Sequence, residues 1–461
     1  MHPSRYQRVK FGDSVLPKKK KQVNPIMLVV IGYLSLILLG SLLLYMPFSH
    51  NGYIPYIDLL FTSTSAVCVT GLSTINIGSS FTAIGDSILM VLMQAGGLGI
   101  MTISTFLILL AGMRPGFNHE SVLLSSFTQE GNIDGKKILM AVLPFTFILE
   151  IIGAVFYFTQ FKNLELGPRI FTAAFQAISS FCNVGFTLFP DSLMQFQFNP
   201  ILNVTTCVLA LAGGFGFLAV AELQYLFNFK SHTFRKMSLH TRVATGFTFI
   251  VILISILFFT VTEWNHGLEG LSFGQKLLSS SFMAFTSRTA GLNTIDVPSL
   301  CYGSLFFFVI IMFIGANPGS CGGGIKTTTA AVIFLLGFNR ILGRKKTQVL
   351  GRSLPEETVD KAVRIFVVAI VMVTLATLVL LQTETPKSDN GFFLKVVFEV
   401  VSAYSTCGLS MGLTSDLSDL GRIVVCIVMF IGRMGPLFLI SAVSKKNEID
   451  TWYAEEDIMV G

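Results

Sequence analysis

Four short stretches of the chain are variations on one pattern, and they recur at nearly equal intervals. Each ends an apolar segment rich in Ser and Thr with a glycine that is followed by a bulky apolar residue. The four glycines are Gly71, Gly185, Gly291 and Gly408, which lie 114, 106 and 117 residues apart. Three stretches carry Phe ten residues before the glycine, and three carry Ser six residues before it. This self-similarity indicates that the chain contains four copies of one unit.

The composition places these units in a membrane. Of 461 residues, 52% are hydrophobic and 13% are charged, whereas a soluble protein has about 25% charged residues. Several apolar runs reach about 20 residues, the length that crosses a bilayer. The seven cysteines have no metal-ligand spacing and the six histidines are scattered, so neither a cofactor site nor an enzyme is indicated. The net charge of +6 gives no reason to expect a nucleic-acid partner, because the location of the charge matters more than its size.

We therefore predict an all-α membrane protein with eight transmembrane helices, in four span–pore-loop–span repeats around one central pore. The repeats cover residues 25–112, 138–228, 243–338 and 362–443. The spans are expected near 25–46, 86–111, 138–160, 201–227, 243–262, 304–338, 362–382 and 422–443. A basic arm, 1–24, precedes the repeats, and a tail, 444–461, follows them.

The positive charges predict the orientation. Most of the 32 Lys and Arg residues lie in the N-terminal arm, in the loops between repeats and in the tail. Loops rich in Lys and Arg stay in the cytoplasm. Both termini of this cell-membrane protein are then cytoplasmic, and the four glycine loops open toward the outside.

The half-length segments between paired spans are the candidate ion filter. A stretch such as 61–70 is too short to span a bilayer, and irregular backbone at membrane depth is tolerated where it lines a water-filled cavity. Channel filters are rings of backbone carbonyls, and glycine allows the angles that turn carbonyls inward. Close helix packing explains a single Gly-Leu or Gly-Phe pair, but four matched positions favour a pore. The expected filter consists of Thr70, Gly71, Leu72, Val184, Gly185, Phe186, Ala290, Gly291, Leu292, Cys407, Gly408 and Leu409.

The last span of the third repeat carries a candidate gate. Pro318 and the surrounding glycines cannot continue an ordinary helix, so the span is expected to break over residues 315–329. The fourth repeat has Arg433 at the same depth, and a charged residue inside a span is a functional-site hypothesis. The expected gating residues are Gly315, Asn317, Gly319, Ser320, Cys321, Gly322, Gly323, Gly324, Lys326 and Arg433.

The fourfold repeat, the tripeptides around the four glycines, the Gly-Ser-Cys-Gly-Gly-Gly-Ile-Lys-Thr-Thr stretch and the Gly-Arg-Met-Gly of the last span together resemble the KtrB/TrkH family of potassium-translocating subunits, and KtrB most closely. The resemblance implies potassium as the transported ion and a homodimer with one pore per protomer. It also implies a separate cytoplasmic ring of nucleotide-binding, RCK-type (KtrA-like) subunits, because this sequence has no Gly-x-Gly-x-x-Gly segment after a strand. Gly71, where related plant transporters selective for sodium have Ser, favours potassium. Cys321 stands where the family often has Ser or Thr. The implied potassium ligands are the backbone carbonyls of Val69, Thr70, Asn183, Val184, Thr289, Ala290, Thr406 and Cys407.

Three questions remain open from the sequence. A secondary carrier that couples potassium uptake to sodium or protons also uses broken helices near the midplane. Glu150 and Glu222 lie within spans, where they serve either such coupling or a hydrogen bond near a helix end. Arg288, just before the third filter glycine, either repels cations or braces its loop, and we favour bracing.

Overall fold

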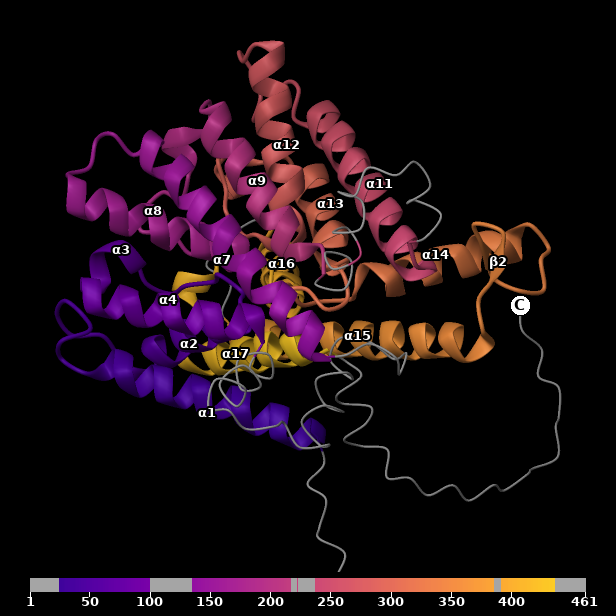
Figure 1. Ribbon diagram of the computed structural model, residues 1–461, viewed down its shortest axis with the longest axis horizontal. Coiled ribbons are helices and arrows are strands. Elements are labelled where there is room, and N and C mark those ends of the chain that lie inside the picture. The colour runs from indigo at the N-terminus through magenta and orange to yellow at the C-terminus, as the bar shows by residue number, and fades with distance from the viewer. Residues whose placement is uncertain (1–24, 100–134, 217–221, 223–236, 385–390, 436–461) are drawn as a thin grey trace, which may run out of the picture.

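A computed structural model describes residues 25–99, 135–216, 222, 237–384 and 391–435 (Figure 1). These residues are mostly helical, in agreement with the predicted fold class. The strands β1 (Gln348–Val349) and β2 (Arg352–Ser353) form a short antiparallel hairpin between the third and fourth repeats. The expected N-terminal arm, 1–24, and the tail, 444–461, lie outside the described residues.

Each repeat has a first helix, a pore helix and a last helix. The first repeat contains α1 (Pro25–Tyr45), α2 (Tyr56–Cys68), a short α3 (Ile77–Ser80) and α4 (Ala83–Leu98). The second contains α7 (Gly135–Gln160), α8 (Leu166–Phe181), η1 (Met194–Phe196) and α9 (Pro200–Gly214). The third contains α11 (Leu239–Thr262), α12 (Phe273–Thr289), η3 (Val297–Ser299), α13 (Tyr302–Phe313) and α14 (Thr327–Ile341). The fourth contains α15 (Glu356–Thr383), α16 (Phe392–Ser405), η4 (Thr414–Asp416) and α17 (Asp419–Met434).

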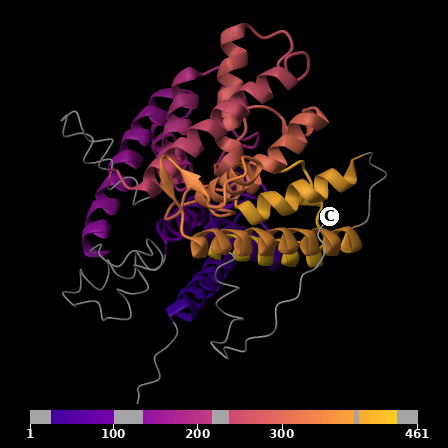
Figure 2. The same cartoon turned by 90° about the vertical axis from the view of Figure 1, so that its right-hand side faces the viewer.

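The four repeats pack around the middle of the molecule in sequence order. The last helix of each repeat packs against the pore helix of the next: α4 against α8, α9 against α12, and α13 against α16. The circle closes because α17 of the fourth repeat packs against α2 of the first. Figure 2 shows the same order as a progression of colours from indigo through purple and salmon to yellow.

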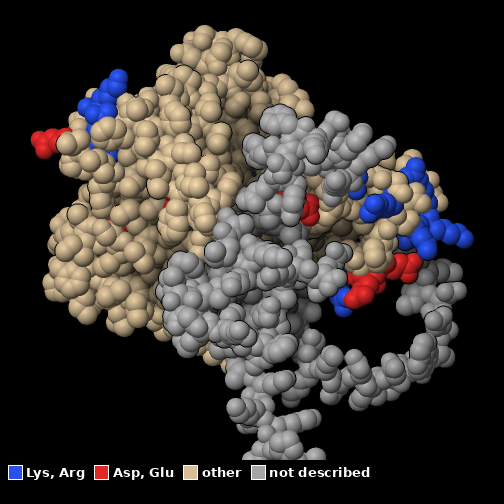
Figure 3. Space-filling model, in the orientation of Figure 1, with Lys and Arg blue, Asp and Glu red and all other residues tan. Residues whose placement is uncertain are grey.

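Helix length and surface character fit a membrane protein. Among the described residues, the helical segments Val142–Gln160, Leu239–Thr262 and Glu356–Thr383 are long and apolar enough to cross a bilayer. Of the other apolar helices, α1 has 21 residues, and α2, α4, α9, α13 and α14 have 12–16. The expected spans 86–111, 201–227 and 422–443 run past the described part of the chain. Large apolar side chains are exposed along α1, α7, α11 and α15. In Figure 3 most of the visible charged residues lie at two opposite ends of the molecule. An apolar belt between charged ends suits burial in lipid.

A polar contact, called here the clasp, recurs where the first helix ends in the second, third and fourth repeats. At the end of α7, Gln160 accepts a hydrogen bond from Asn199 just before α9 (2.9 Å). After α11, the buried carboxylate of Glu263 accepts the N–H of Cys301 just before α13 (3.0 Å). After α15, the buried carboxylate of Glu384 accepts both the N–H (3.0 Å) and the hydroxyl (2.7 Å) of Ser418 just before α17. These contacts join the first and last helices of a repeat.

Candidate ion pathway

The four filter glycines contact one another in a closed ring. A β-carbon built on any of them would lie closer than 3.0 Å to the carbonyl oxygen of the residue just before the next filter glycine. Side chains do not tolerate such approaches, so the ring requires glycine at all four positions. The pairs are Gly71 with Val184, Gly185 with Ala290, Gly291 with Cys407, and Gly408 with Thr70.

The backbone angles impose the same requirement. The φ angles of the four glycines are positive, a region that residues with a β-carbon rarely adopt. The values are 93° for Gly71, 88° for Gly185, 65° for Gly291 and 94° for Gly408. The predicted filter glycines therefore share one conformation and lie at one place in the fold.

The serine six residues before the glycine ties the filter to its pore helix. The Ser65 hydroxyl accepts the N–H of Gly71 (3.0 Å), and the Ser402 hydroxyl accepts the N–H of Gly408 (3.1 Å). In the second repeat the Ser179 hydroxyl donates to the carbonyl of Phe186 (2.6 Å). The third repeat has Phe285 at this position. The serine noticed in the sequence thus connects the pore helix to the loop that carries the glycine.

The third repeat also differs in its backbone. The residue two before the filter glycine has a left-handed conformation in the other repeats, with φ of 59° at Val69, 58° at Asn183 and 51° at Thr406. In the third repeat Thr289 is still helical, and Ala290 caps the helix in a right-handed conformation. The eight carbonyls expected as potassium ligands therefore do not come from four equivalent backbones.

The last helices approach the filter through glycines. An added β-carbon on Gly96, Gly213 or Gly432 would collide with a backbone carbonyl of a pore helix. The colliding carbonyls belong to Val67, Phe181 and Tyr404, each four residues before its filter glycine. The small-residue clusters of the sequence therefore bring these helices directly against the end of the pore helix.

The last segment of the third repeat is broken. Helix α13 ends at Phe313 and α14 begins at Thr327, while Ile314 and Ile325 form a parallel bridge that brings the two ends together. The connecting residues lie directly against the filter, because the N–H of Gly323 donates to the hydroxyl of Thr406 (2.8 Å). A β-carbon on Gly322 would collide with the side chain of Thr289.

Backbone and side-chain contacts fix this segment to the second and fourth repeats. The N–H groups of Asn317 and Cys321 donate to the carbonyls of Gly214 (3.2 Å) and Gly213 (3.1 Å). The Asn317 amide accepts from the Thr248 hydroxyl (3.1 Å) and donates to the Phe215 carbonyl (3.1 Å). The remaining contacts are Ser320 Oγ to Asn317 O (2.6 Å), Lys326 Nζ to Gly322 O (2.8 Å) and Gly324 N to Gly432 O (3.4 Å), with Gly319 at a φ of 68°.

Two arginines hold the segment at different points. The Arg433 guanidinium donates to the carbonyls of Cys321 and Gly96, and to that of Gly97 (3.3 Å). It therefore links the segment to the last helices of the fourth and first repeats. Arg288 donates to the Gly315 carbonyl (3.2 Å) and the Thr327 hydroxyl (3.0 Å). These contacts favour the bracing interpretation of Arg288.

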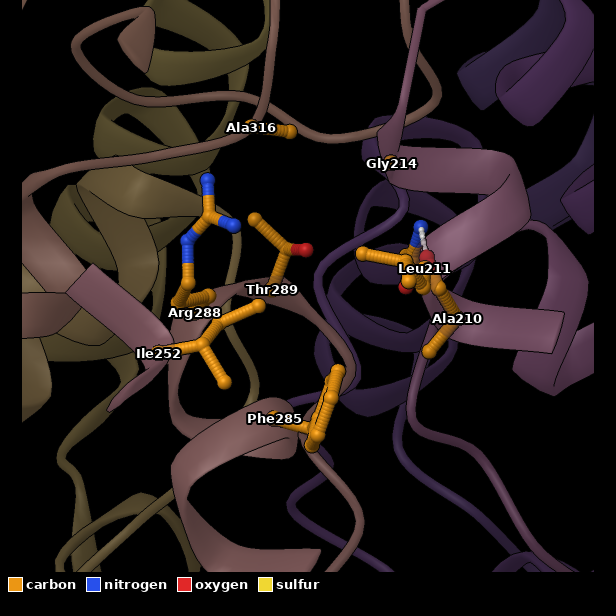
Figure 4. Close-up of a pocket in the computed structure, with 9 residues that line it drawn as sticks. Ala210, Leu211, Gly214, Ile252, Phe285, Arg288, Thr289 and Ala316 are labelled. Carbon is orange, nitrogen blue, oxygen red and sulfur yellow. Dashed lines mark hydrogen bonds between the residues drawn. The ribbon is translucent and has the colours of Figure 1, made fainter. Parts of the chain in front are cut away.

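A small cavity of about 20 Å³ lies between the second and third filter loops (Figure 4). Its lining includes Asn183, Gly214, Arg288, Thr289 and Ala316. In Figure 4 the guanidinium of Arg288 extends toward the strand that carries Ala316. A cavity of this size holds about one water molecule and leaves no room for an organic cofactor. Within the described residues, no group of three or more His, Cys, Asp or Glu side chains could hold a metal ion.

Three further carboxylates, those of Glu150, Glu222 and Glu399, are buried or half-buried. Glu150 accepts a hydrogen bond from Gln94 (3.2 Å), whose carbonyl accepts from the Cys182 thiol (3.6 Å). Glu222 accepts the N–H and the hydroxyl of Ser238 at the start of α11 (3.1 Å each), as a partner of a helix end. Sequence reasoning missed Glu399 in the pore helix α16, although a carboxylate in an apolar pore helix, followed by Ser and Thr after the filter, was a usable signal.

Comparisons with known proteins show the family and the overall fold of the chain. The TrkH family of cation transport proteins matches residues 17–452. The chain is 35% identical to the potassium/sodium uptake protein NtpJ of Enterococcus hirae, over 96% of this chain and 98% of the relative. It is 34% identical to the Ktr system potassium uptake protein B of Bacillus subtilis, over 95% of this chain and 97% of the relative. The crystal structure of the potassium transporter TrkH from Vibrio parahaemolyticus superimposes with a TM-score of 0.74 at 19% identity, covering 93% of this chain and 87% of that one. The chain therefore belongs to the TrkH family of cation transport proteins.

Proposed function

We propose that this protein takes up potassium across the cell membrane through a channel-like pore. The observation that carries the proposal is the closed ring of glycines, in which each repeat places a positive-φ glycine against a carbonyl of its neighbour. A ring of backbone carbonyls can replace the hydration shell of a cation. Two full-length relatives are named as potassium uptake proteins, which favours potassium as the ion that the ring selects.

The proposed potassium ligands are the carbonyls of the two residues before each filter glycine. In the first, second and fourth repeats the left-handed residue at the first of these positions changes the direction of successive carbonyls. The third repeat lacks this turn. We therefore propose that the third repeat contributes its ligands with a different geometry. The four glycines then form a fourfold ring, whereas the carbonyls of the residues before them are arranged less symmetrically.

The segment 315–329 is the proposed gate. It lies against residues two positions before the filter glycines, at Thr289 and Thr406. The Arg433 guanidinium also brings a positive charge to this part of the structure. A segment in this place, held by a cation, would obstruct a passing potassium ion both sterically and electrostatically.

The proposed assembly is a homodimer with a separate, cytoplasmic ring of RCK-type subunits that binds nucleotide. The relative from Bacillus subtilis is named as one protein of a Ktr system, which supports a multi-component transporter. The hairpin of β1 and β2 and the basic residues near it lie at one end of the molecule (Figures 1 and 3). We propose that this end is cytoplasmic, as both termini are, and that it faces the ring.

Ion flux into liposomes tests the function. The purified chain should take up rubidium down its gradient, potassium should compete better than sodium, and no counter-ion should be needed. Replacing Gly71 by Ser should weaken the preference for potassium, because Gly71 has a φ of 93° and no room for a β-carbon. Uptake that requires a sodium or proton gradient would instead support the carrier, and an unchanged ion preference in Gly71→Ser would contradict the filter.

A further inference from the structure

We infer that Glu399 is a positioning residue that sets the ion preference without facing the ion. It does so by fixing residues 406–414, a mostly irregular segment that contains the fourth filter glycine and is called here the fourth filter strand. This inference rests on the proposed filter function and adds a residue that does not line the path. Glu399 lies in the pore helix α16, nine residues before Gly408, and its side chain is fully buried.

Both oxygens of the carboxylate bind the chain that follows the filter. Glu399 Oε2 accepts the hydroxyl of Ser410 (2.7 Å), and Oε1 accepts the hydroxyl of Thr414. Ser410 comes two residues after Gly408 and directly after Leu409, which is itself buried. The carboxylate therefore connects the middle of the pore helix to the strand that leaves the filter.

The directions of the hydrogen bonds require an acceptor at this position. The Ser410 hydroxyl already accepts the N–H of Gly412 (3.1 Å), so its own hydrogen is available to Glu399. The Thr414 hydroxyl lies within hydrogen-bonding distance of both the other carboxylate oxygen and the Ser410 oxygen (2.9 Å), and the ionised carboxylate, as the stronger acceptor, takes its one hydrogen. A carboxylate accepts at both oxygens, whereas an amide offers one acceptor and one donor. Glutamine has the size of glutamate but cannot accept both hydroxyls.

The other repeats do not brace their filters from this position. The residues nine before the filter glycine are Thr62, Gln176 and Phe282. Thr62 donates to the carbonyl of Asp58 (2.8 Å) and Gln176 to the hydroxyl of Ser180 (3.4 Å), each within its own pore helix, while Phe282 is apolar. Within the described residues, the double brace from pore helix to outgoing strand at this position is a feature of the fourth repeat.

The fourth strand matters because it closes the ring. A β-carbon on Gly408 would collide with the carbonyl of Thr70, and one on Gly291 with the carbonyl of Cys407. A shift of the fourth strand therefore changes its contacts with both the first and the third strands. Ion preference depends on the spacing of such carbonyls, so a brace on this strand acts on selectivity without touching the ion.

The test compares Glu399→Gln with Ser410→Ala and Ser410→Thr in liposomes, by competition of potassium and sodium against rubidium uptake. Glu399→Gln and Ser410→Ala should each lower the potassium-to-sodium preference about tenfold, which corresponds to the loss of one hydrogen bond of about 1.4 kcal/mol. Ser410→Thr keeps the hydroxyl and should keep the preference. The double variant Glu399→Gln/Ser410→Ala should lower the potassium-to-sodium preference no further than either single variant, because both single variants disturb the same contact between Glu399 and Ser410.

Glu384→Gln is the matched control. Glu384 is also a buried carboxylate, and it accepts two hydrogen bonds from Ser418 at the start of α17 and one from Thr383 (3.3 Å), none of them from the filter strand. Its loss should reduce the amount of folded protein and leave the ion preference unchanged. An unchanged preference in Glu399→Gln, or an equal change in Glu384→Gln, would overturn the inference. The filter proposal is tested separately by Gly71→Ser, since that variant shifts the preference whether or not Glu399 does.

Discussion

Replacing Arg433 by Ala should release the segment 315–329 and raise the rate of potassium uptake. The guanidinium donates hydrogen bonds to the carbonyls of Cys321, Gly96 and Gly97. Of these, Cys321 belongs to the segment, while Gly96 and Gly97 belong to α4. Alanine removes the link between them and leaves all four filter glycines in place.

The size of the increase in uptake follows from the hydrogen bond that Arg433→Ala removes. A hydrogen bond from a charged donor contributes about 1.5–3 kcal/mol, and every 1.4 kcal/mol changes a population about tenfold. If the link to Cys321 is made in the closed state and lost in the open state, its removal raises the open population roughly 10- to 100-fold, provided that the open state is rare at rest. The loss of the positive charge acts in the same direction.

The assay is the initial rate of rubidium uptake into liposomes by the purified chain. Arg433→Lys keeps the positive charge but lacks the planar guanidinium group, so it should raise the uptake rate less than Arg433→Ala does. Arg422→Ala is a matched control, because Arg422 lies on the same helix but pairs with Asp58 (3.2 Å) away from the segment. Deletion of 320–324 should raise the rate as Arg433→Ala does, and both variants should retain the preference for potassium. A rate at or below that of the unmodified protein, in folded samples of both variants, would refute the assignment of the gate.

Other predictions follow from the filter, the clasps and the assembly. Gly71→Ser should lower the potassium preference in the competition assay, since a side chain at a φ of 93° costs roughly 1–2 kcal/mol and displaces the neighbouring carbonyl. The pKa of Glu263 is raised by burial, but hydrogen bonds from Ser304, Cys301 and Gly267 outweigh burial and hold the pKa below its ordinary value of 4.5. A depressed pKa stabilises the fold above pH 4.5 and ceases to do so as the pH falls through the folded-state pKa. Thermal unfolding in detergent should therefore be less acid-sensitive in Glu263→Gln, and equal acid sensitivity would contradict this. A soluble nucleotide-binding partner should co-purify with the chain and change its uptake rate with nucleotide; full nucleotide-dependent regulation of the chain alone would contradict a separate ring.

The ring of four glycines was predictable because the requirement for glycine is local and strict. A positive φ and a carbonyl within 3.0 Å of the β-carbon position exclude every residue with a side chain. The same demand arises four times, so it leaves a periodic mark on the sequence. The accompanying serines, such as Ser65 and Ser402, were visible for the same reason, since each accepts the N–H of its own filter glycine.

The asymmetry of the third repeat was less visible. Its sequence differs at Phe285, where the other repeats have serine, and the pore helix α12 then runs to Thr289, two residues before its glycine. In the first and fourth repeats the pore helix ends three residues before the glycine, at Cys68 and Ser405. Aligning the repeats on their glycines assumes equal helix ends, and that assumption fails where the serine that would bind the loop is missing.

The two arginines were partly predictable, because the sequence marks the residues but not their contacts. The sequence marks Arg288 and Arg433 as charges at membrane depth, but it cannot name their acceptors, which are mostly carbonyls of residues 27 to 337 positions away in the chain. In the structure Arg288 binds Gly315 and Thr327, where the broken segment begins and ends, and the bridge of Ile314 with Ile325 lies at the same point. Arg433 instead binds Cys321, midway along the segment. The N–H groups of Cys321 and Gly323 also hold the middle, but the loss of Arg433 removes a charged tie there and leaves both ends fixed. For that reason we assign the release of the proposed gate to Arg433, and the preservation of its hinge to Arg288.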